Sequence, residues 1–459
     1  MDLIVANGTV VTAADVYRAD VGVRGGRIVA ISEELTPGPS TRVLDASGRY
    51  VFPGGVDSHT HLDMPFGGTI TADDFRTGTI AAACGGTTSI VDFCIPAKGQ
   101  RLADALKVWH EKAAGKAAID YGFHSVIVEM PDAVYDELPT LPDHGVTSLK
   151  LFMAYKGTLM SDDWTLVRAL ARGKAHGALV MVHAENGDAV FFLQRHLLAE
   201  GKTAPKYHAT SRPPRVEAEA TARAIALAET LGAPLYVVHV TCAEALEEIE
   251  RARARGVAVL AETCTQYLYF TESDLDRPNF EGAKFVFTPP LRGPHQHELL
   301  WRALANGSLQ AVTSDHCSFN LKGQKELGRD DFTKIPNGGP GIEERLTMVY
   351  QGVNERRITL NRFVELVSTG PARIFGLYPR KGTIAVGGDA DLVVWNPEAE
   401  ATITNASLHH NVDYTLYEGK QVRGLPETVT LRGQVIVDRR RYVGTPGTGQ
   451  FLPRARFGG

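Results

Sequence analysis

The feature that most constrains the fold of this chain is a regular alternation of short apolar runs with long helical stretches between residues 53 and 370. Strands that alternate with helices, such as those expected over 217–231 and 243–255, form βαβ units with a parallel sheet. Eight such units over roughly 320 residues favour a (β/α)8 TIM barrel. A doubly wound sheet is the alternative, because periodicity does not reveal whether a sheet closes. The expected strands cover residues 51–59, 87–93, 121–128, 148–152, 178–183, 235–239, 257–262 and 310–315.

The two ends of the chain have a different sequence pattern. Short β-branched runs are separated by Asn-Gly and Gly-Gly turns before residue 50, and similar runs return after residue 380. Because chain termini often lie close together, one small β-sandwich built from both ends is the simplest interpretation. We therefore predict an α/β protein with a discontinuous β-sandwich domain (1–52 and 375–440), a barrel domain (53–374) and a basic C-terminal arm (441–459).

Composition limits the partners and the compartment. Lys and Arg number 48 against 53 Asp and Glu, a formal net charge of −5, whereas nucleic acids and anionic membranes attract strongly basic proteins. No apolar run approaches the ~20 residues that cross a bilayer, and the first residues do not resemble a signal peptide. The five cysteines never occur in C-x-x-C spacing, which disfavours a disulfide scaffold. We expect a cytoplasmic protein that binds neither nucleic acid nor membrane.

Several of the expected strands end in a side chain that can bind a metal. Because all strands of a barrel end on the same face, these side chains are expected to meet in one pocket. Imidazole and carboxylate groups suit divalent ions. Four histidines and one aspartate are more ligands than a single tetrahedral site with an open position can use. The number of ligands therefore favours two metals ~3.5–4 Å apart. For His183, His239 or Asp315 alone a structural role is the alternative, and we expect His316, next to Asp315, to contact the metal ligands without binding the metal. The strand-end residues are His59, His61, Lys150, His183, His239 and Asp315.

Lys150 is the unusual member of this set. As an ammonium it would repel two bound cations, so its alternative role is that of a surface lysine or of a buried lysine with a lowered pKa. Converted by CO₂ into a carbamate, it would become an anion with two oxygens that could bridge two metals.

The chain resembles the dihydropyrimidinase and D-hydantoinase group of the amidohydrolase superfamily over essentially its full length. The segments that carry the resemblance include residues 52–61 (FPGGVDSHTH), 85–88 (GGTT), 148–156 (SLKLFMAYK), 183–186 (HAEN), 236–240 (YVVHV), 289–292 (PPLR), 314–317 (SDHC), 335–338 (IPNG) and 381–392. The chain departs from the usual family pattern by having Thr288 in place of Ser, and Ser58 and Thr265 in place of Pro. None of these departures removes an expected metal ligand.

The resemblance implies a distorted barrel that holds two Zn²⁺ per subunit. His59, His61 and Asp315 would bind one metal, His183 and His239 the other, and N6-carboxylated Lys150 would bridge them. It further implies the roles of three other residues: Tyr155 would stabilise an oxyanion, and the main chains of Thr288 and Asn337 would hold a cyclic amide. The apolar residues expected to gate the substrate are Leu62, Met64, Phe66, Phe152 and Leu159.

The implied reaction is the hydrolytic ring opening of 5,6-dihydropyrimidines and 5-substituted hydantoins to N-carbamoyl amino acids. A metal-bridging hydroxide would attack the ring carbonyl, and Asp315 would act as general base and then as general acid. The resemblance also implies a homotetramer. Two alternatives stay open: a sister cyclic amidohydrolase, such as an allantoinase or a dihydroorotase, and a non-catalytic scaffold relative. All six ligand positions are filled, which weighs against the scaffold.

Overall fold

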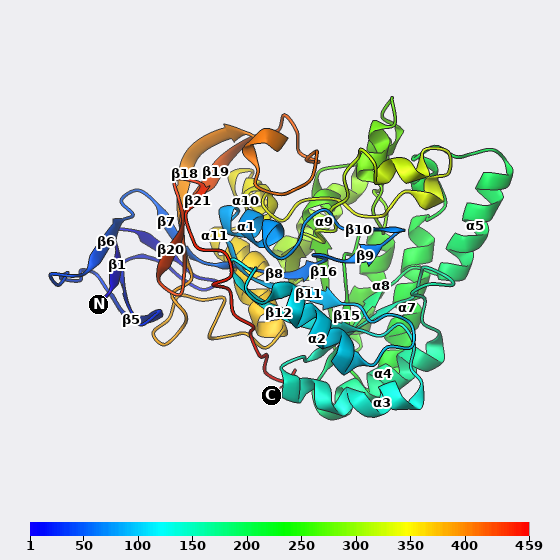
Figure 1. Cartoon of the computed structure of the whole chain (residues 1–459), viewed down its shortest axis with the longest axis horizontal. Helices are drawn as coiled ribbons and strands as arrows, with labels where there is room; N and C mark the ends of the chain where they lie inside the picture. The colour runs from blue at the N-terminus through cyan, green and yellow to red at the C-terminus, as the bar shows by residue number, and fades with distance from the viewer. Residues whose placement is uncertain (459) are drawn as a thin grey trace.

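Eight parallel strands form the wall of a nearly closed barrel in the computed structural model, which describes residues 1–458 (Figure 1). They pair in the order β17-β16-β15-β14-β13-β12-β11-β8. The seam between β8 and β17 is closed by single contacts, in which the Ser314 N–H donates to Asp57 and the His61 N–H donates to the His316 carbonyl. The strands are β8 (Gly55–Thr60), β11 (Thr87–Cys94), β12 (Asp120–Val126), β13 (Ser148–Phe152), β14 (Leu179–His183), β15 (Leu235–Val237), β16 (Val259–Cys264) and β17 (Ala311–Thr313).

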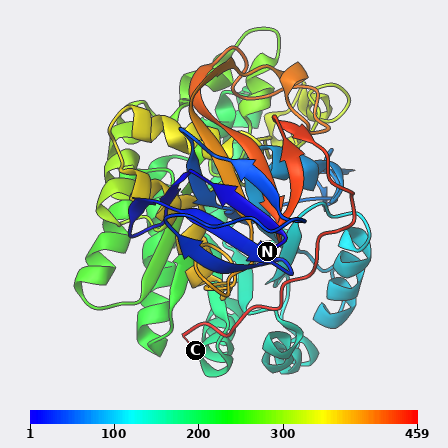
Figure 2. The ribbon, with the colours of Figure 1, turned by 90° about the vertical axis from the view of Figure 1, so that its left-hand side faces the viewer.

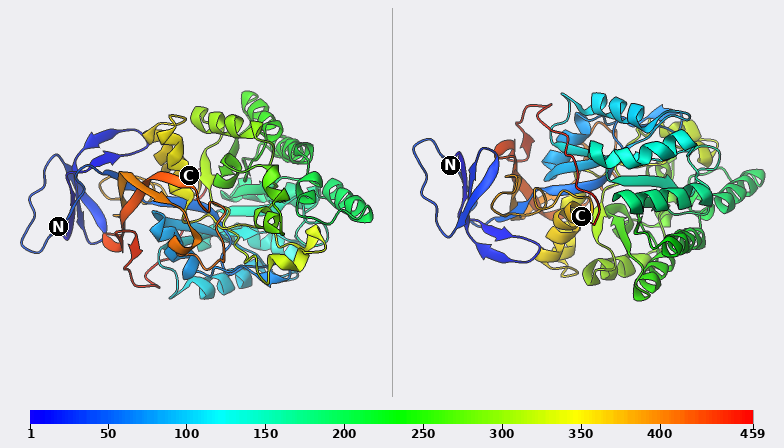
Figure 3. Two further views of the ribbon diagram at one scale, coloured as in Figure 1. Left: turned by 90° about the horizontal axis from the view of Figure 1, so that it is seen from above. Right: turned by 90° about the horizontal axis from the view of Figure 1, so that it is seen from below.

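Helices surround this sheet on its outer side (Figure 3). Local signals fix their ends: α4, for example, starts where Asp162 accepts a hydrogen bond from the Thr165 N–H and stops at Gly177, whose φ is 71°. Within residues 1–458 no helix has the length and apolar character needed to cross a bilayer. The helices are α1 (Thr77–Cys84), α2 (Leu102–Ala113), α3 (Asp132–Glu137), α4 (Asp163–His176), α5 (Gly187–Ala199), α6 (Tyr207–Thr210), α7 (Pro214–Leu231), α8 (Ala243–Ala254), α9 (His295–Asn306), α10 (Arg345–Asn354), α11 (Leu360–Val364) and α12 (Gly370–Ile374).

A β-domain lies against one side of the barrel and is built from both ends of the chain (Figure 2). Its larger sheet has the order β21-β20-β19-β18-β7-β2-β3 and its smaller sheet the order β5-β4-β1-β6, and buried side chains of the two sheets share one apolar core. This arrangement confirms the predicted combination of a TIM barrel with a β-sandwich. The strands are β1 (Leu3–Ala6), β2 (Thr9–Val11), β3 (Val16–Arg18), β4 (Asp20–Arg24), β5 (Arg27–Ser32), β6 (Arg42–Asp45), β7 (Tyr50–Pro53), β18 (Leu392–Thr402), β19 (Gln421–Leu431), β20 (Gln434–Asp438) and β21 (Arg441–Tyr442).

The strand predicted over residues 51–59 is in fact two strands in different sheets. β7 belongs to the β-domain, β8 belongs to the barrel, and Gly54 separates them. A Cβ atom at Gly54 would lie 2.0 Å from the Thr88 hydroxyl, so the chain passes from one domain to the other at a point where no side chain fits. A continuous apolar run does not reveal such a break.

The predicted C-terminal arm makes ordered contacts with both domains. β21 extends the larger sheet beyond residue 440, because Val437 and Asp438 pair with Tyr442 and Arg441. Further along, Phe451 forms a bridge with Tyr121 of β12, and the chain continues beneath the barrel (Figure 3). The arm thus closes the bottom of the barrel, at the end opposite the strand carboxyl termini.

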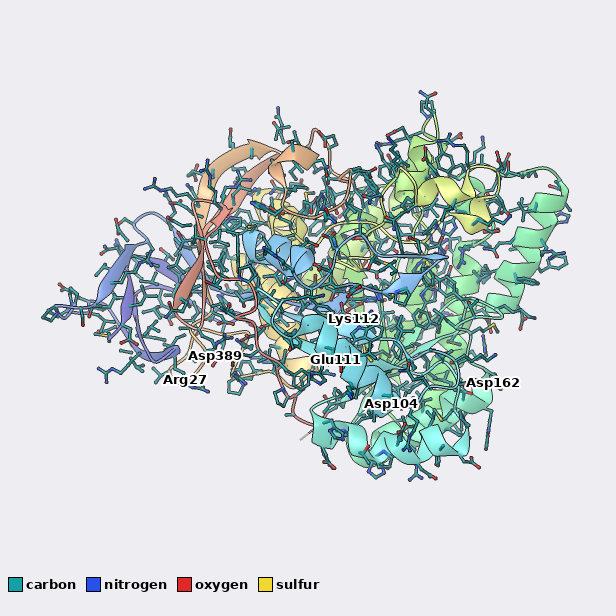
Figure 4. All side chains as sticks on the ribbon, in the orientation of Figure 1. Arg27, Asp104, Glu111, Lys112, Asp162 and Asp389 are labelled. Atoms are coloured by element: carbon teal, nitrogen blue, oxygen red, sulfur yellow. The ribbon has the colours of Figure 1, made fainter. Side chains whose placement is uncertain are left out.

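A buried ion cluster connects the β-domain to the barrel. The Lys381 amine lies 2.7 Å from Asp120 at the start of β12, 2.6 Å from Asp391 and 3.0 Å from Asp389. The Lys381 side chain is 1% exposed, and despite its burial the three carboxylates raise its pKa. At the outer edge of the cluster Arg27 approaches Asp389 (Figure 4). The Lys381 ammonium therefore joins carboxylates from both domains, and Arg432 pairs with Asp120 as well.

We expect Lys381→Met to destabilise the protein by about 3–5 kcal/mol, because three buried carboxylates would lose their common partner. The measurement is the midpoint of urea unfolding. Arg380→Met is the matched control: Arg380 pairs with Asp389 from a side chain that is 38% exposed, so its loss should cost less than about 1 kcal/mol. Equal effects of the two substitutions would contradict the role of the cluster.

Candidate metal centre and active site

The strand-end residues line one cavity at the carboxyl ends of the barrel strands. His59 lies within β8, Lys150 within β13 and His183 at the end of β14, whereas His239 and Asp315 each follow the last residue of a strand by two positions. His239 (φ 39°) and Asp315 (φ 48°) both adopt the left-handed backbone region. Such conformations are uncommon for residues other than glycine and occur often at functional sites.

Three donor atoms converge on one side of the cavity. Asp315 Oδ1 lies 3.1 Å from His59 Nε2 and 3.2 Å from His61 Nε2, and His59 and His61 are buried. Burial opposes a charge on His59, but Asp315 and Glu262 raise its pKa to about 9; burial lowers the pKa of His61 to about 4. The two imidazoles hold the pKa of Asp315 well below its usual range, although burial acts in the opposite direction. The three side chains form a candidate metal site.

Two further imidazole nitrogens meet on the other side of the cavity. His183 Nδ1 lies 2.9 Å from His239 Nε2, and both side chains are buried. Burial lowers the pKa of each well below its usual range, so both rings are neutral near pH 7. Neutral imidazole is the form that binds metal ions.

Lys150 is completely enclosed between these two groups and has no hydrogen-bond partner among the described residues. Its amine faces the rings of Phe93 and Phe152, 4.8 and 4.4 Å from their centroids. Burial lowers the pKa of Lys150 to about 8. A buried amine without a partner is costly. The Lys150 amine, the four imidazoles and the Asp315 carboxylate together form a set of donors that suits divalent metal ions. Such a set would be costly in a protein interior that held no ion.

Acidic side chains that we did not predict as site residues orient the histidines from behind. Glu262 of β16 binds His59 Nδ1 through one oxygen and accepts a hydrogen bond from the Tyr236 hydroxyl (2.8 Å) through the other. Glu185 binds His183 Nε2 (2.7 Å) and Arg212 (2.6 Å). Partners of this kind fix which ring nitrogen can bind a metal. Their sequence signal was available, because Glu262 ends a predicted strand and Glu185 follows His183 by two residues.

His316 is turned away from the cavity. Its Nε2 binds Asp73 (3.0 Å), and its Nδ1 accepts a hydrogen bond from the Gly341 N–H (3.2 Å). This is the geometry of the supporting role that we expected for His316.

The remaining predicted site residues divide between the cavity wall and the core. Leu62 does not line the cavity; it is fully buried and packs against Gly78 of α1, where an added Cβ would lie 2.4 Å from its side chain. The prediction placed it in the gate as one of the apolar residues that match the family's gate loops, but the chain turns its side chain into the core. The others line the cavity, together with Ile95, Phe287, Cys317 and Gly338: they are Met64, Phe66, Phe152, Tyr155, Leu159, Thr288 and Asn337.

Tyr155 has the environment of a neutral hydroxyl donor. Burial raises its pKa to about 12, although Arg212 and hydrogen bonds with Thr288 and Asn337 oppose this shift. The Arg212 guanidinium lies 5.6 Å from the centre of the Tyr155 ring. The phenol therefore stays protonated near pH 7 and can donate a hydrogen bond into the cavity.

A buried lysine joins two segments of the cavity wall. The Lys325 amine, 0% exposed, donates to the carbonyls of Val286 (2.9 Å) and Pro336 (3.1 Å). Val286 lies two residues before Thr288, and Pro336 directly precedes Asn337. Lys325 thus fixes the distance between the segments that present Thr288 and Asn337. No motif pointed to it, because it lies in a short polar stretch far from both segments in sequence.

Side chains with metal-binding atoms that converge at the mouth of a TIM barrel with an attached β-domain are typical of hydrolases that use a bound metal. Comparison with known proteins agrees: residues 50–422 match the model of the Amidohydrolase family. A D-hydantoinase from Ralstonia pickettii is 58% identical over the full length of both chains. The crystal structure of a dihydropyrimidinase from Brevibacillus agri NCHU1002 is 54% identical with a TM-score of 0.99 over both full chains. That of an L-hydantoinase (dihydropyrimidinase) from Arthrobacter aurescens is 30% identical with a TM-score of 0.90, covering 99% of this chain and all of the other.

The chain belongs to the amidohydrolase family and, within it, to the dihydropyrimidinase and D-hydantoinase group. It is therefore an enzyme, a hydrolase of cyclic amides.

We expect Lys325→Met to raise KM at least about tenfold with a smaller change in kcat, because the two wall segments would lose the amine that joins them. Steady-state kinetics on one cyclic amide checks this, and the exposed Lys322→Met is the control. Unchanged KM in Lys325→Met would contradict the role.

The same variant has a second readout. Burial lowers the pKa of Lys325 to about 7, below the ~10.4 of an unfolded lysine. Between these values the unfolded chain binds a proton that the folded chain does not. The free energy of unfolding should therefore rise with pH in this window more steeply in the wild type than in Lys325→Met.

Proposed function

We propose that this enzyme opens the ring of 5-substituted hydantoins and 5,6-dihydropyrimidines by hydrolysis and releases N-carbamoyl amino acids. The observation that carries the proposal is the convergence of four imidazoles, one carboxylate and one unpartnered lysine amine in a single apolar-walled cavity. The names of the similar proteins, D-hydantoinase and dihydropyrimidinase, support this choice of substrates.

Two Zn²⁺ ions are the proposed cofactors. His59, His61 and Asp315 would hold one ion, and His183 and His239 the other. Lys150 would serve both as a carbamate: its neutral amine attacks CO₂, an N–C bond forms and the nitrogen releases a proton. The lowered pKa of about 8 supports this step, since only the neutral amine reacts. When bound, the metals supply Lewis acidity and an activated water near neutral pH.

Asp315 is the proposed proton carrier. Its carboxylate is ionised and faces the cavity, so it can take the proton of the attacking water and return it to the departing ring nitrogen. The Tyr155 hydroxyl is proposed to donate to the ring carbonyl oxygen as negative charge develops there. These two side chains divide the chemistry between proton transfer and charge stabilisation.

The cavity wall supports the proposed substrate contacts. The main chains of Thr288 and Asn337 would hold the cyclic amide from one side. The four apolar gate residues in the wall would contact the group at ring position 5, and the D-hydantoinase relatives support a preference for the D enantiomer. Phe66 lies in a small hairpin formed by β9 (Pro65–Phe66) and β10 (Thr69–Ile70), and its ring contacts Tyr155 at a centroid distance of 5.5 Å.

One observation argues against a dihydroorotase. Dihydroorotate carries a carboxylate that needs a cationic partner, yet no arginine is among the described residues that line the cavity. Behind the wall, Arg212 is bound to Glu185.

The direct test is hydrolysis by the zinc-loaded enzyme of dihydrouracil, both enantiomers of a 5-substituted hydantoin, allantoin and dihydroorotate. We expect turnover of the first two classes, with the D-hydantoin preferred, and loss of both metal and activity in Lys150→Ala. Partial rescue of that variant by a short carboxylic acid would support the carbamate. Preferred turnover of allantoin or dihydroorotate would overturn the proposal.

We expect Asp315→Asn to lose ~10²–10⁴-fold in kcat even with metal bound, because an amide oxygen can coordinate a metal but cannot carry a proton. Turnover should be compared at equal metal content, measured by mass spectrometry. A fully metallated variant that retains more than about a tenth of wild-type turnover would exclude Asp315 as the proton carrier.

Tyr155→Phe should lower kcat by ~10²–10³-fold with a smaller change in KM, because the oxyanion that its hydroxyl would stabilise exists only after attack. Thr288→Ser is the matched variant. It keeps both the hydroxyl and the main-chain groups, so its effect should stay within about 1–2 kcal/mol and appear mainly in KM. The reverse pattern in steady-state kinetics would show that the two roles are assigned wrongly.

A further inference from the structure

A second cavity, of about 450 Å³, lies between the barrel and the β-domain. It shares no lining residue with the catalytic cavity. Its walls come from the end of α1, the turn before α10, the short 3-10 helix η8 (Asn405–Ser407) with the loop that follows it, the neighbouring parts of β18 and β19, and residues 439–441. The barrel supplies the first two segments and the β-domain side supplies the others.

Three side chains with metal-binding atoms meet in this cavity. Cys84 is the last residue of α1, Glu343 lies in the turn before α10, and His409 lies in the β-domain loop. One donor atom from each lies within 4.8 Å of the other two. Cys84 and Glu343 are buried, and His409 is partly exposed to the cavity. A thiol, a carboxylate and an imidazole from three separate segments thus face a common point.

These donors are held in place without a bound ion. Glu343 accepts hydrogen bonds from the main-chain N–H of His409 (2.7 Å) and pairs with His409 Nδ1 (2.8 Å), which leaves Nε2 as the free ring nitrogen. Next to Cys84, an added Cβ at Gly85 would lie 2.1 Å from the Glu343 carbonyl oxygen. The main chains beside Cys84 and Glu343 are therefore in direct contact, and the donor geometry is fixed by the fold.

A fourth polar group in this cavity is incompletely paired. Glu344, 2% exposed, lines the same cavity; one of its oxygens accepts from the Thr415 hydroxyl, and the other has no hydrogen-bond partner among the described residues. Arg439, Arg440 and Arg441 also line the cavity, but they are exposed, and none forms an ion pair with Glu343 or Glu344 in the described part of the chain. Glu343 is paired with the His409 ring, whereas the second oxygen of Glu344 has no such partner, and a buried oxygen left unpaired is costly.

We propose that Cys84, Glu343 and His409 form a second, structural zinc site that fastens the β-domain to the barrel. The mixed sulfur, nitrogen and oxygen donors suit Zn²⁺ and disfavour Mg²⁺ or Ca²⁺, which select oxygen ligands. On binding, the Cys84 S–H bond breaks, the sulfur coordinates the metal as a thiolate, and the proton is released to solvent. Water completes the coordination.

Cobalt substitution tests the site without relying on activity. None of the proposed catalytic ligands contains sulfur, so thiolate-to-Co²⁺ charge transfer in the near ultraviolet reports on a cysteine ligand alone. We expect the Co²⁺-loaded wild type to show this band. Cys84→Ser and, as a second route, His409→Gln should each bind one metal per subunit fewer than the wild type, and Cys84→Ser should lose the band while its turnover of a cyclic amide stays at the wild-type level.

Cys317→Ser is the matched control, because Cys317 is the cysteine that lines the catalytic cavity. It should keep the band. Loss of the band in Cys317→Ser, absence of the band from the wild type, or equal metal content in the wild type and Cys84→Ser would each overturn the proposal. None of these outcomes depends on which cyclic amide the enzyme hydrolyses, so failure here is distinguishable from failure of the proposed catalytic function.

Discussion

The enclosure of ionisable side chains in a space without bulk water is the constraint on which the catalytic end of this molecule depends. Burial keeps the His183 and His239 rings neutral, and it leaves the Lys150 amine without a partner. Burying a charged group costs much free energy unless a group of opposite charge pairs with it. Glu262 and Glu185 supply fixed negative groups behind the rings, and they leave the inward-facing atoms free for chemistry.

The same contacts close the barrel and bring the side chains of the candidate metal centre together. The seam between β8 and β17 places the His61 N–H on the His316 carbonyl, and this contact brings the His61 ring to Asp315. Deeper in the same seam Asp57 accepts the Ser314 N–H and lies 3.4 Å from the fully buried Arg345. A change that opens the seam would therefore separate donor atoms that lie far apart in the sequence. Stability of the barrel and integrity of the site cannot vary independently.

The sequence predicted the structure well where a polar residue marks the end of an apolar strand. Buried parallel strands are continuous apolar runs, so the polar residue that stops each run is visible; β13 was predicted with the bounds that it has, and the side chain of His183 was placed correctly at the end of β14. What could not be predicted depends on contacts across the fold. Lys325 acts between two segments that approach only in three dimensions, and Leu62 turns into the core although its neighbour His61 faces the cavity. Periodicity describes faces of single elements, whereas these positions are decided by how elements meet.

The shared β-domain has a consequence for how the chain is made on the ribosome. β7 pairs along one edge with β2, but the partner of its other edge is β18, where Leu392 lies opposite Pro53. The whole barrel is translated between these two strands. During that interval the unpaired edge of β7 is open to a strand of another newly made chain. Unpaired strand edges promote misassembly. Folding of the barrel brings β18 to β7. The faster the barrel folds, the shorter the time in which chains being translated from the same messenger RNA can aggregate through this edge.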